Sequence, residues 1–90
     1  MRYVILDTET TGLSPANGHR IIEIAAIEVD GRNVTNNTFQ VYLNPQRLVE
    51  PEAFQVHGLS DQFLEDKPKF SAIVDDFLMF VKDSHVVIHN

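Results

Sequence analysis

Four consecutive apolar residues near the start of the chain, Tyr3-Val4-Ile5-Leu6, constrain the possible folds more than any other feature. Successive side chains of a β-strand point to opposite faces of the sheet. A strand that is apolar on both faces is typical of the centre of a sheet with both of its faces covered. The run therefore predicts a central, buried strand.

Two further strands are expected to complete an antiparallel meander. Ile21–Val29 is a second apolar run, whose period alone fits either a strand or a helix. Asp30-Gly31 follows it directly, and this pair is a strong hairpin-turn signal, which favours the strand. Residues 39–43 then alternate between apolar and polar types, which predicts a third strand that ends before Asn44-Pro45.

The second half of the chain has the pattern of helices. Pro51 can begin a short helical turn and Gly58 can end it. Ser60 is a plausible N-cap for a second short helix that stops before Pro68.

The clearest helical pattern lies over residues 70–81, followed by a short apolar run. The apolar residues that recur there at helical spacing, and so form one stripe, are Phe70, Ile73, Val74, Phe77, Phe80 and Val81. Val86–Ile88 then predicts a buried strand. Because a helical crossover leads to it, we expect it to be parallel to a strand of the meander.

Composition excludes several classes of protein. Lysine and arginine number 7 against 13 acidic residues, a net charge of −6, which argues against a simple electrostatic nucleic-acid binder. The absence of cysteine excludes a disulfide scaffold, a thiolate zinc site and a cysteine nucleophile. Tyr3–Leu6 is too short for a signal peptide or a membrane span, so a soluble, cytoplasmic protein is expected.

Two acidic residues, Asp7 and Glu9, follow the first apolar strand directly. Residues two apart on a strand share a face, with Cα atoms about 6.5–7 Å apart. The same face carries Tyr3 and Ile5, so the carboxylates are expected to extend a buried apolar row.

Two buried anions need a positive partner, because they repel each other and lose hydration. No lysine or arginine lies between Leu6 and Gly18. Magnesium or manganese would suit ligands that are all oxygen, whereas zinc favours nitrogen and sulfur. The Thr-Thr-Gly that follows strengthens the hypothesis, because the glycine permits a ligand close to the backbone. The alternative is that both carboxylates cap the following loop in water.

At this point a family resemblance can be stated. Asp7-Thr8-Glu9-Thr10-Thr11-Gly12 resembles the first motif of the DEDD-type 3′–5′ exonucleases. The stretches similar to the proofreading members of that family are Ile21-Ile22-Glu23-Ile24, Val41-Tyr42-Leu43, Pro51-Glu52-Ala53-Phe54 and Val56-His57-Gly58. Val87-Ile88-His89-Asn90 resembles the start of the family's second motif, H-N-x-x-F-D.

The resemblance implies an α/β, ribonuclease-H-like fold, with a three-stranded antiparallel meander, a crossover helix and a parallel strand. It implies metal-dependent 3′–5′ hydrolysis of DNA ends, in proofreading during replication. Asp7 and Glu9 would be catalytic and would bind substrate through two divalent ions, Mg²⁺ or Mn²⁺. The loop Thr10, Thr11, Gly12 and Leu13 would approach the terminal sugar and base. Glu52 and His57 would contact the terminal nucleotide.

Each of the two residues near the short helix also has a structural alternative. Glu52 is well placed to interact with a helix dipole. His57 could be a partly buried ring that bonds a backbone carbonyl. His19 and His85 are expected to face solvent, and His89 to be structural. Asp75, Asp76 and Asp83 are expected to form a solvated helix face.

The chain departs from the family by an absence. The second motif stops at His89-Asn90, before its aspartate, and the third motif, H-x-A-x-x-D, with its general-base histidine, is missing. We therefore expect residues 1–90 to be the N-terminal part of a single exonuclease domain and, taken alone, to be inactive.

The resemblance also implies partners, a polymerase catalytic subunit and a small accessory subunit, besides the DNA 3′ terminus. Two other interpretations remain open. One is an oligoribonuclease or another RNA exonuclease of the same fold. The other is a non-catalytic interaction module.

Overall fold

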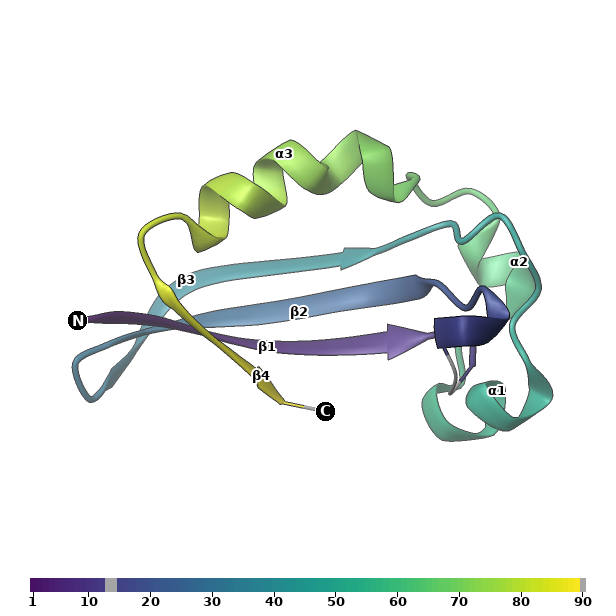
Figure 1. The fold of residues 1–90 in the computed structure, drawn as a ribbon, viewed down its shortest axis with the longest axis horizontal. Helices are drawn as coiled ribbons and strands as arrows, with labels where there is room; N and C mark the ends of the chain where they lie inside the picture. Colours follow the sequence, from purple (N-terminus) through teal and green to yellow (C-terminus); the bar gives the residue numbers. More distant parts are fainter. Residues whose placement is uncertain (13–14, 90) are drawn as a thin grey trace.

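A computed structural model describes residues 1–12 and 15–89 of the chain. Its centre is a four-stranded sheet in the order β3-β2-β1-β4, formed by β1 (Arg2–Thr10), β2 (Ile21–Asp30), β3 (Asn33–Tyr42) and β4 (His85–His89) (Figure 1). The first three strands are antiparallel neighbours, and β4 is parallel to β1. The predicted meander and the predicted parallel strand are both confirmed.

A tight hairpin joins β2 and β3. Asp30 pairs with Asn33, and Gly31 between them has φ 63°, which glycine adopts without strain. β3 begins at Asn33, earlier than the alternation of residues 39–43 predicts, because pairing with β2 holds its polar first half in the sheet. The strand ends at Tyr42, and Leu43 lies buried just beyond it.

The three α-helices follow the predicted boundaries: α1 (Pro51–His57), α2 (Asp61–Leu64) and α3 (Phe70–Val81). A 3-10 turn, η1 (Pro15–Asn17), was not predicted from the sequence. Gly58 ends α1 with φ 71° and donates its N–H to the Phe54 carbonyl at 2.8 Å. The Ser60 hydroxyl caps α2 by accepting the Phe63 N–H at 3.0 Å.

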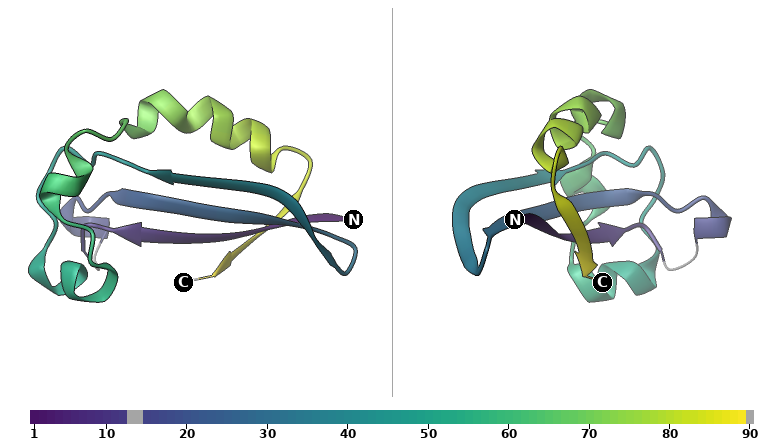
Figure 2. Two further views of the ribbon diagram at one scale, coloured as in Figure 1. Left: turned by 180° about the vertical axis from the view of Figure 1, so that it is seen from behind. Right: turned by 60° about the vertical axis from the view of Figure 1, so that its left-hand side comes forward.

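The hydrophobic core lies between the sheet and α3, which covers one face of the sheet in all views (Figures 1 and 2). The buried residues of this core are Val4, Leu6, Ile24, Ala26 and Leu43, and the side chains packed on them are Phe39, Val41, Ile73, Phe77, Phe80 and Val81. Four of the six predicted stripe residues of α3 therefore belong to this layer, and the exposed Asp75 and Asp76 are on its solvent side.

The opposite face of the sheet is open in the part of the chain that the structure describes. Ile5, Ile27 and Val87 on this face are 36, 38 and 49% exposed. The expectation that β1 is covered on both faces is therefore wrong for residues 1–12 and 15–89, because α3 covers one face while α1 and α2 lie beyond the end of the sheet (Figure 2). β4, predicted as buried, is exposed at every position, because it is an edge strand with no described residue across its outer side.

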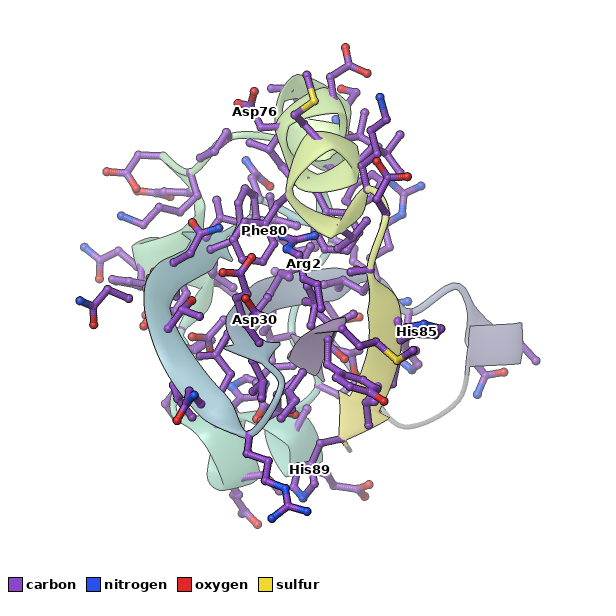
Figure 3. The ribbon with its side chains drawn as sticks, turned by 90° about the vertical axis from the view of Figure 1, so that its left-hand side faces the viewer. Arg2, Asp30, Asp76, Phe80, His85 and His89 are labelled. Atoms are coloured by element: carbon purple, nitrogen blue, oxygen red, sulfur yellow. The ribbon has the colours of Figure 1, made fainter. Side chains whose placement is uncertain are left out.

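Arg2 connects three elements at the other end of the sheet. Its guanidinium bonds the Glu28 carboxylate on β2 and the backbone carbonyls of Phe80 and Lys82 at the end of α3. Figure 3 shows Arg2 reaching toward Phe80 beneath the helix. These bonds satisfy carbonyls that the last turn of a helix leaves without partners.

None of the helices in the described residues has the length and apolar character needed to cross a membrane.

Candidate functional site

Asp7 and Glu9 lie near the carboxyl end of β1. Their register partners on β2 are Ala25 and Glu23, and Asp7 is also in register with His89 on β4. Because they are two residues apart on one regular strand, both carboxylates occupy the open face of the sheet, as predicted. The expected burial of the row is wrong: Asp7 is exposed and Glu9 half-buried, since no described residue covers this face.

The two carboxylates have no cationic partner among the described residues, where no salt bridge involves either of them. Glu23 faces Glu9 across the strand pair, but the Gln40 amide holds its carboxylate at 3.0 Å. No group of three or more His, Cys, Asp or Glu residues that could hold a metal occurs within residues 1–12 and 15–89. Asp7 and Glu9 therefore offer oxygen ligands to a hard cation, but only part of a coordination shell.

The strand pairing becomes irregular directly after Glu9. Thr10 pairs with Ile21, so Ile22 is the extra residue at a bulge in β2. Bulges re-aim side chains and often occur beside functional sites. Beyond this bulge, Thr11 and Gly12 are both buried.

Thr11 is fully buried, and it is bonded on three sides. Its N–H donates to the Arg20 carbonyl (2.9 Å), and its carbonyl accepts the Glu50 N–H (2.8 Å). Its hydroxyl accepts the Arg20 N–H (3.0 Å) and lies 3.0 Å from Nδ1 of His19. Thr11 thus joins the end of β1 to the segments that lead into β2 and α1.

Gly12 serves internal packing. A Cβ atom at this position would collide with the ring of His19, so the glycine is needed to admit that ring. From the sequence, the missing side chain at Gly12 was expected to make room for a ligand. On the side where a Cβ would project, it makes room for the His19 ring instead. The expectation that His19 faces solvent is wrong as well, because its side chain is only 5% exposed. Leu13, the last predicted residue of the loop, lies outside the described residues.

His57 has a structural role at the end of α1. Its Nδ1 accepts the Leu59 N–H at 3.0 Å, and its Nε2 lies 3.1 Å from the Thr10 carbonyl. These partners assign the hydrogen to Nε2, which donates to Thr10. The alternative of a partly buried ring bonded to a carbonyl is confirmed. Glu52 is exposed in the first turn of α1, where its negative charge interacts favourably with the positive end of the helix dipole.

The remaining histidines lie on β4. His85 is exposed, as expected, and its ring lies 5.4 Å from the ring of Tyr3 on the open face. His89 ends the strand beside the position of Asp7 and is exposed (Figure 3).

A hollow of about 370 Å³ lies away from the two carboxylates. Arg20, Asn44, Lys69 and Phe70 are among the residues that line it, and Asp7 and Glu9 are not. The candidate site is therefore an open surface at the end of β1 in the described chain, not this hollow.

Sequence reasoning missed His19 and Glu50 as partners of the loop. His19 Nε2 lies 3.5 Å from Glu50 Oε1, although 31 residues separate the two in the chain. Neither residue belongs to a recognisable motif. The available signal was local: a histidine two residues before the second apolar strand and a glutamate directly before Pro51.

Comparisons with known proteins identify the family of the chain. The sequence model described as Exonuclease matches residues 4–90. A protein named DNA polymerase III subunit epsilon from Rickettsia conorii is 53% identical over 90 residues, which are 100% of this chain and 39% of that protein. The protein of the same name from Escherichia coli is 52% identical over 93 aligned residues, 99% of this chain and 38% of that protein. The chain thus spans about two fifths of the length of these relatives.

Two solved structures share the fold. Exonuclease X, in complex with 5′ overhanging duplex DNA, superimposes with a TM-score of 0.81 at 27% identity, over 98% of this chain and 48% of that one. Product-bound exonuclease I superimposes with a TM-score of 0.80 at 25% identity, over 97% of this chain and 21% of that one. Exonucleases of this family and fold generally use divalent metal ions. The match over residues 4–90, the ribonuclease-H-like sheet and the paired carboxylates that end β1 together show that the chain belongs to the exonuclease family.

Proposed function

We propose that the protein carrying this chain is a metal-dependent 3′–5′ exonuclease that acts on DNA ends and proofreads during replication. The observation that carries the proposal is the placement of Asp7 and Glu9 on one face at the carboxyl end of β1 in a member of the exonuclease family. Residues 1–90 would form the N-terminal part of a single exonuclease domain. This is supported by the alignment, in which the chain spans only about two fifths of the length of its relatives.

Asp7 and Glu9 would hold divalent ions, Mg²⁺ or Mn²⁺, two of them in the complete domain. Their donor set fits this use, because it consists of carboxylate oxygens without a cationic partner among the described residues. When bound, such ions supply a polarised water and stabilise charge on the phosphate. The role of the protein is to hold the two carboxylates in fixed positions on a paired strand.

The terminal nucleotide would lie beside the Thr10–Leu13 loop, with Glu52 and His57 near it. Support comes from the bond between His57 and the Thr10 carbonyl, which keeps the end of α1 next to the end of β1. His57 would act by holding this loop, because both of its ring nitrogens already have backbone partners. Glu52, exposed on α1, is free to reach a ligand.

The proofreading assignment is supported by two relatives named DNA polymerase III subunit epsilon. A polymerase catalytic subunit, a small accessory subunit and a DNA 3′ terminus would be the partners. A replication enzyme of a bacterium would work in the cytoplasm.

The proposal is tested with the full-length protein and a 3′-ended single-stranded DNA. We expect nucleoside monophosphates to be released only when Mg²⁺ or Mn²⁺ is present. Asp7→Asn and Glu9→Gln should each lower kcat by about a hundredfold or more, because each removes charge from the metal ligands. Asp76→Asn, on the solvent side of α3, is the matched control and should leave kcat unchanged. Equal activity of Asp7→Asn and the unmodified protein would refute the proposal.

Two further measurements separate the other interpretations. Comparing degradation of matched single-stranded DNA and RNA distinguishes a proofreading enzyme from an oligoribonuclease, which should prefer RNA. Calorimetric titration of Mn²⁺ tests the non-catalytic interaction module. An affinity that does not change in Asp7→Ala or Glu9→Ala would favour the module and contradict a metal site at these residues.

A further inference from the structure

We propose that His19 is a positioning residue for the substrate loop, and that it sets the affinity for the terminal nucleotide through Thr11 and Gly12. The proposal rests on the proposed exonuclease function and extends it to a residue outside the family motifs. His19 lies eight residues after Thr11 in the chain and does not touch Asp7 or Glu9 in the described contacts.

The ring of His19 lies under the loop and is nearly enclosed, with its side chain 5% exposed. Nδ1 lies 3.0 Å from the Thr11 hydroxyl, and the ring fills the space that a Cβ at Gly12 would need. Two consecutive residues of the loop therefore rest on one imidazole, one through a polar contact and the other through packing.

The polar contacts form one consistent chain of donors and acceptors. The Thr11 hydroxyl accepts the Arg20 N–H at 3.0 Å, which leaves its own hydrogen free for Nδ1 of His19. Nε2 then carries the ring hydrogen and faces Glu50 Oε1 at 3.5 Å, an electrostatic contact longer than a hydrogen bond.

Glu50 is itself anchored. Its N–H donates to the Thr11 carbonyl at 2.8 Å, and its carboxylate lies 3.9 Å from the Arg47 guanidinium. Arg47 in turn donates to the carbonyl of Asn17, the last residue of the turn η1, at 3.1 Å. His19 thus lies between the segment before α1 and the end of β1, and its ring fixes the position of one relative to the other.

A histidine that only filled the core would pack among apolar side chains. His19 lies instead among polar groups, with Thr11 and Glu50 at its two nitrogens. His57 binds the preceding residue, Thr10, from α1. Two histidines from different segments therefore hold three consecutive residues, from Thr10 at the end of the metal-site strand to Gly12. That arrangement fixes the backbone of the loop without engaging the carboxylates.

The consequence is a selective effect on substrate affinity. The carboxylates are held by β1 pairing, which does not involve His19, so metal binding should not depend on it. The loop would contact substrate in the ground state and the transition state alike, and loss of such binding raises KM with kcat retained. A purely structural role would differ, because a smaller folded fraction lowers the apparent kcat and leaves KM unchanged.

The test measures KM and kcat on a 3′-ended DNA with the full-length protein. His19→Phe keeps the ring against Gly12 but removes both nitrogens, and should raise KM by about tenfold with kcat within about twofold. His19→Asn keeps a polar atom near the position of Nδ1 and should recover much of the affinity. Thr11→Val removes the matching hydroxyl. Combined with His19→Phe, it should raise KM no further than either change alone, because both remove the same contact.

His85→Phe is the matched control, since His85 lies on β4 in register with Tyr3, at the opposite end of β1 from Glu9. Its KM should equal that of the unmodified protein. An unchanged KM in His19→Phe, or additive effects of His19→Phe and Thr11→Val, would overturn the positioning role. If the unmodified protein degrades DNA while Asp7→Asn does not, these outcomes would leave the exonuclease proposal intact. An unmodified protein that does not degrade DNA would instead refute that proposal.

Discussion

At the scale of single residues, glycine is required at position 12 for a different reason from the one that the sequence motif suggests. A glycine after two threonines is typical of a loop that admits a ligand. In the fold, the side of Gly12 where a Cβ would project is filled by the His19 ring. The glycine is therefore needed for packing between two segments of the protein.

Gly12→Ala is expected to destabilise the fold by about 1–3 kcal/mol, because the new methyl group forces the enclosed His19 ring to move. Thermal unfolding of the full-length protein, followed by circular dichroism, measures the effect.

The double variant with His19→Ala is the control for this mechanism. Removing the ring makes room for the methyl group, so the effect of Gly12→Ala should shrink in that background. An equal loss of stability in both backgrounds would mean that the collision with His19 is not the cause.

At the scale of elements, the ends of the short helices are set by local sequence, and the end of α3 by a distant residue. Gly58 and Ser60 act within a few residues of the helices that they bound. The carbonyls of Phe80 and Lys82 are instead bonded by Arg2, about 80 residues away in the chain. No pattern within α3 indicates this cap.

The Arg2–Glu28 pair makes stability depend on pH. The pKa of Glu28 lies below its ordinary value of 4.5. The largest cause is the hydrogen bond from Arg2, and the second is the hydrogen bond from the Thr35 hydroxyl. Desolvation raises the pKa, but by less. Because the folded pKa is lowered, the ionised carboxylate stabilises the fold above 4.5. That contribution is lost as the pH falls through the lowered folded pKa.

Glu28→Gln should therefore lower the Tm at neutral pH, and the difference from the unmodified protein should shrink as the pH falls below 4.5. Melting curves at a series of pH values provide the measurement. In an Arg2→Met background the pH dependence should largely flatten, since the main cause of the shift is gone. A Tm difference that is constant with pH would contradict this account.

At the scale of the whole molecule, the described chain is a sheet with one covered face. α3 buries one side, and the other side carries the carboxylates together with the exposed Ile5, Ile27 and Val87. The chain spans about two fifths of its relatives' length. The site is accordingly a two-carboxylate surface with no third acidic or histidine ligand among the described residues.

The 90-residue polypeptide alone is expected to show no metal-dependent nuclease turnover above that of its own Asp7→Asn variant. Two carboxylates cannot fix two cations, and the sequence lacks the histidine motif of the family. Release of monophosphates from labelled DNA is the measurement, with far-UV circular dichroism to verify folding. Turnover that Asp7→Asn abolishes would show that residues 1–90 suffice for catalysis.

The sequence by itself determined what depends on neighbouring residues. Apolar runs and alternation predicted the strands, and helical spacing predicted α3. The turn and cap residues predicted α1, α2 and the hairpin, and the spacing of Asp7 and Glu9 predicted their shared face. These features arise from periods of two and 3.6 residues and from local hydrogen bonds, so they can be read along the chain.

Only the tertiary structure decided which residues meet across the fold. It left the carboxylate face open where a buried row was expected, enclosed His19 where solvent was expected, and joined Arg2 to the end of α3. The physical reason is that burial and long-range hydrogen bonds depend on which surfaces come together. A side chain such as His19 is fixed by partners from the loop after β1 and from the segment before α1, and its own neighbours in sequence do not reveal them.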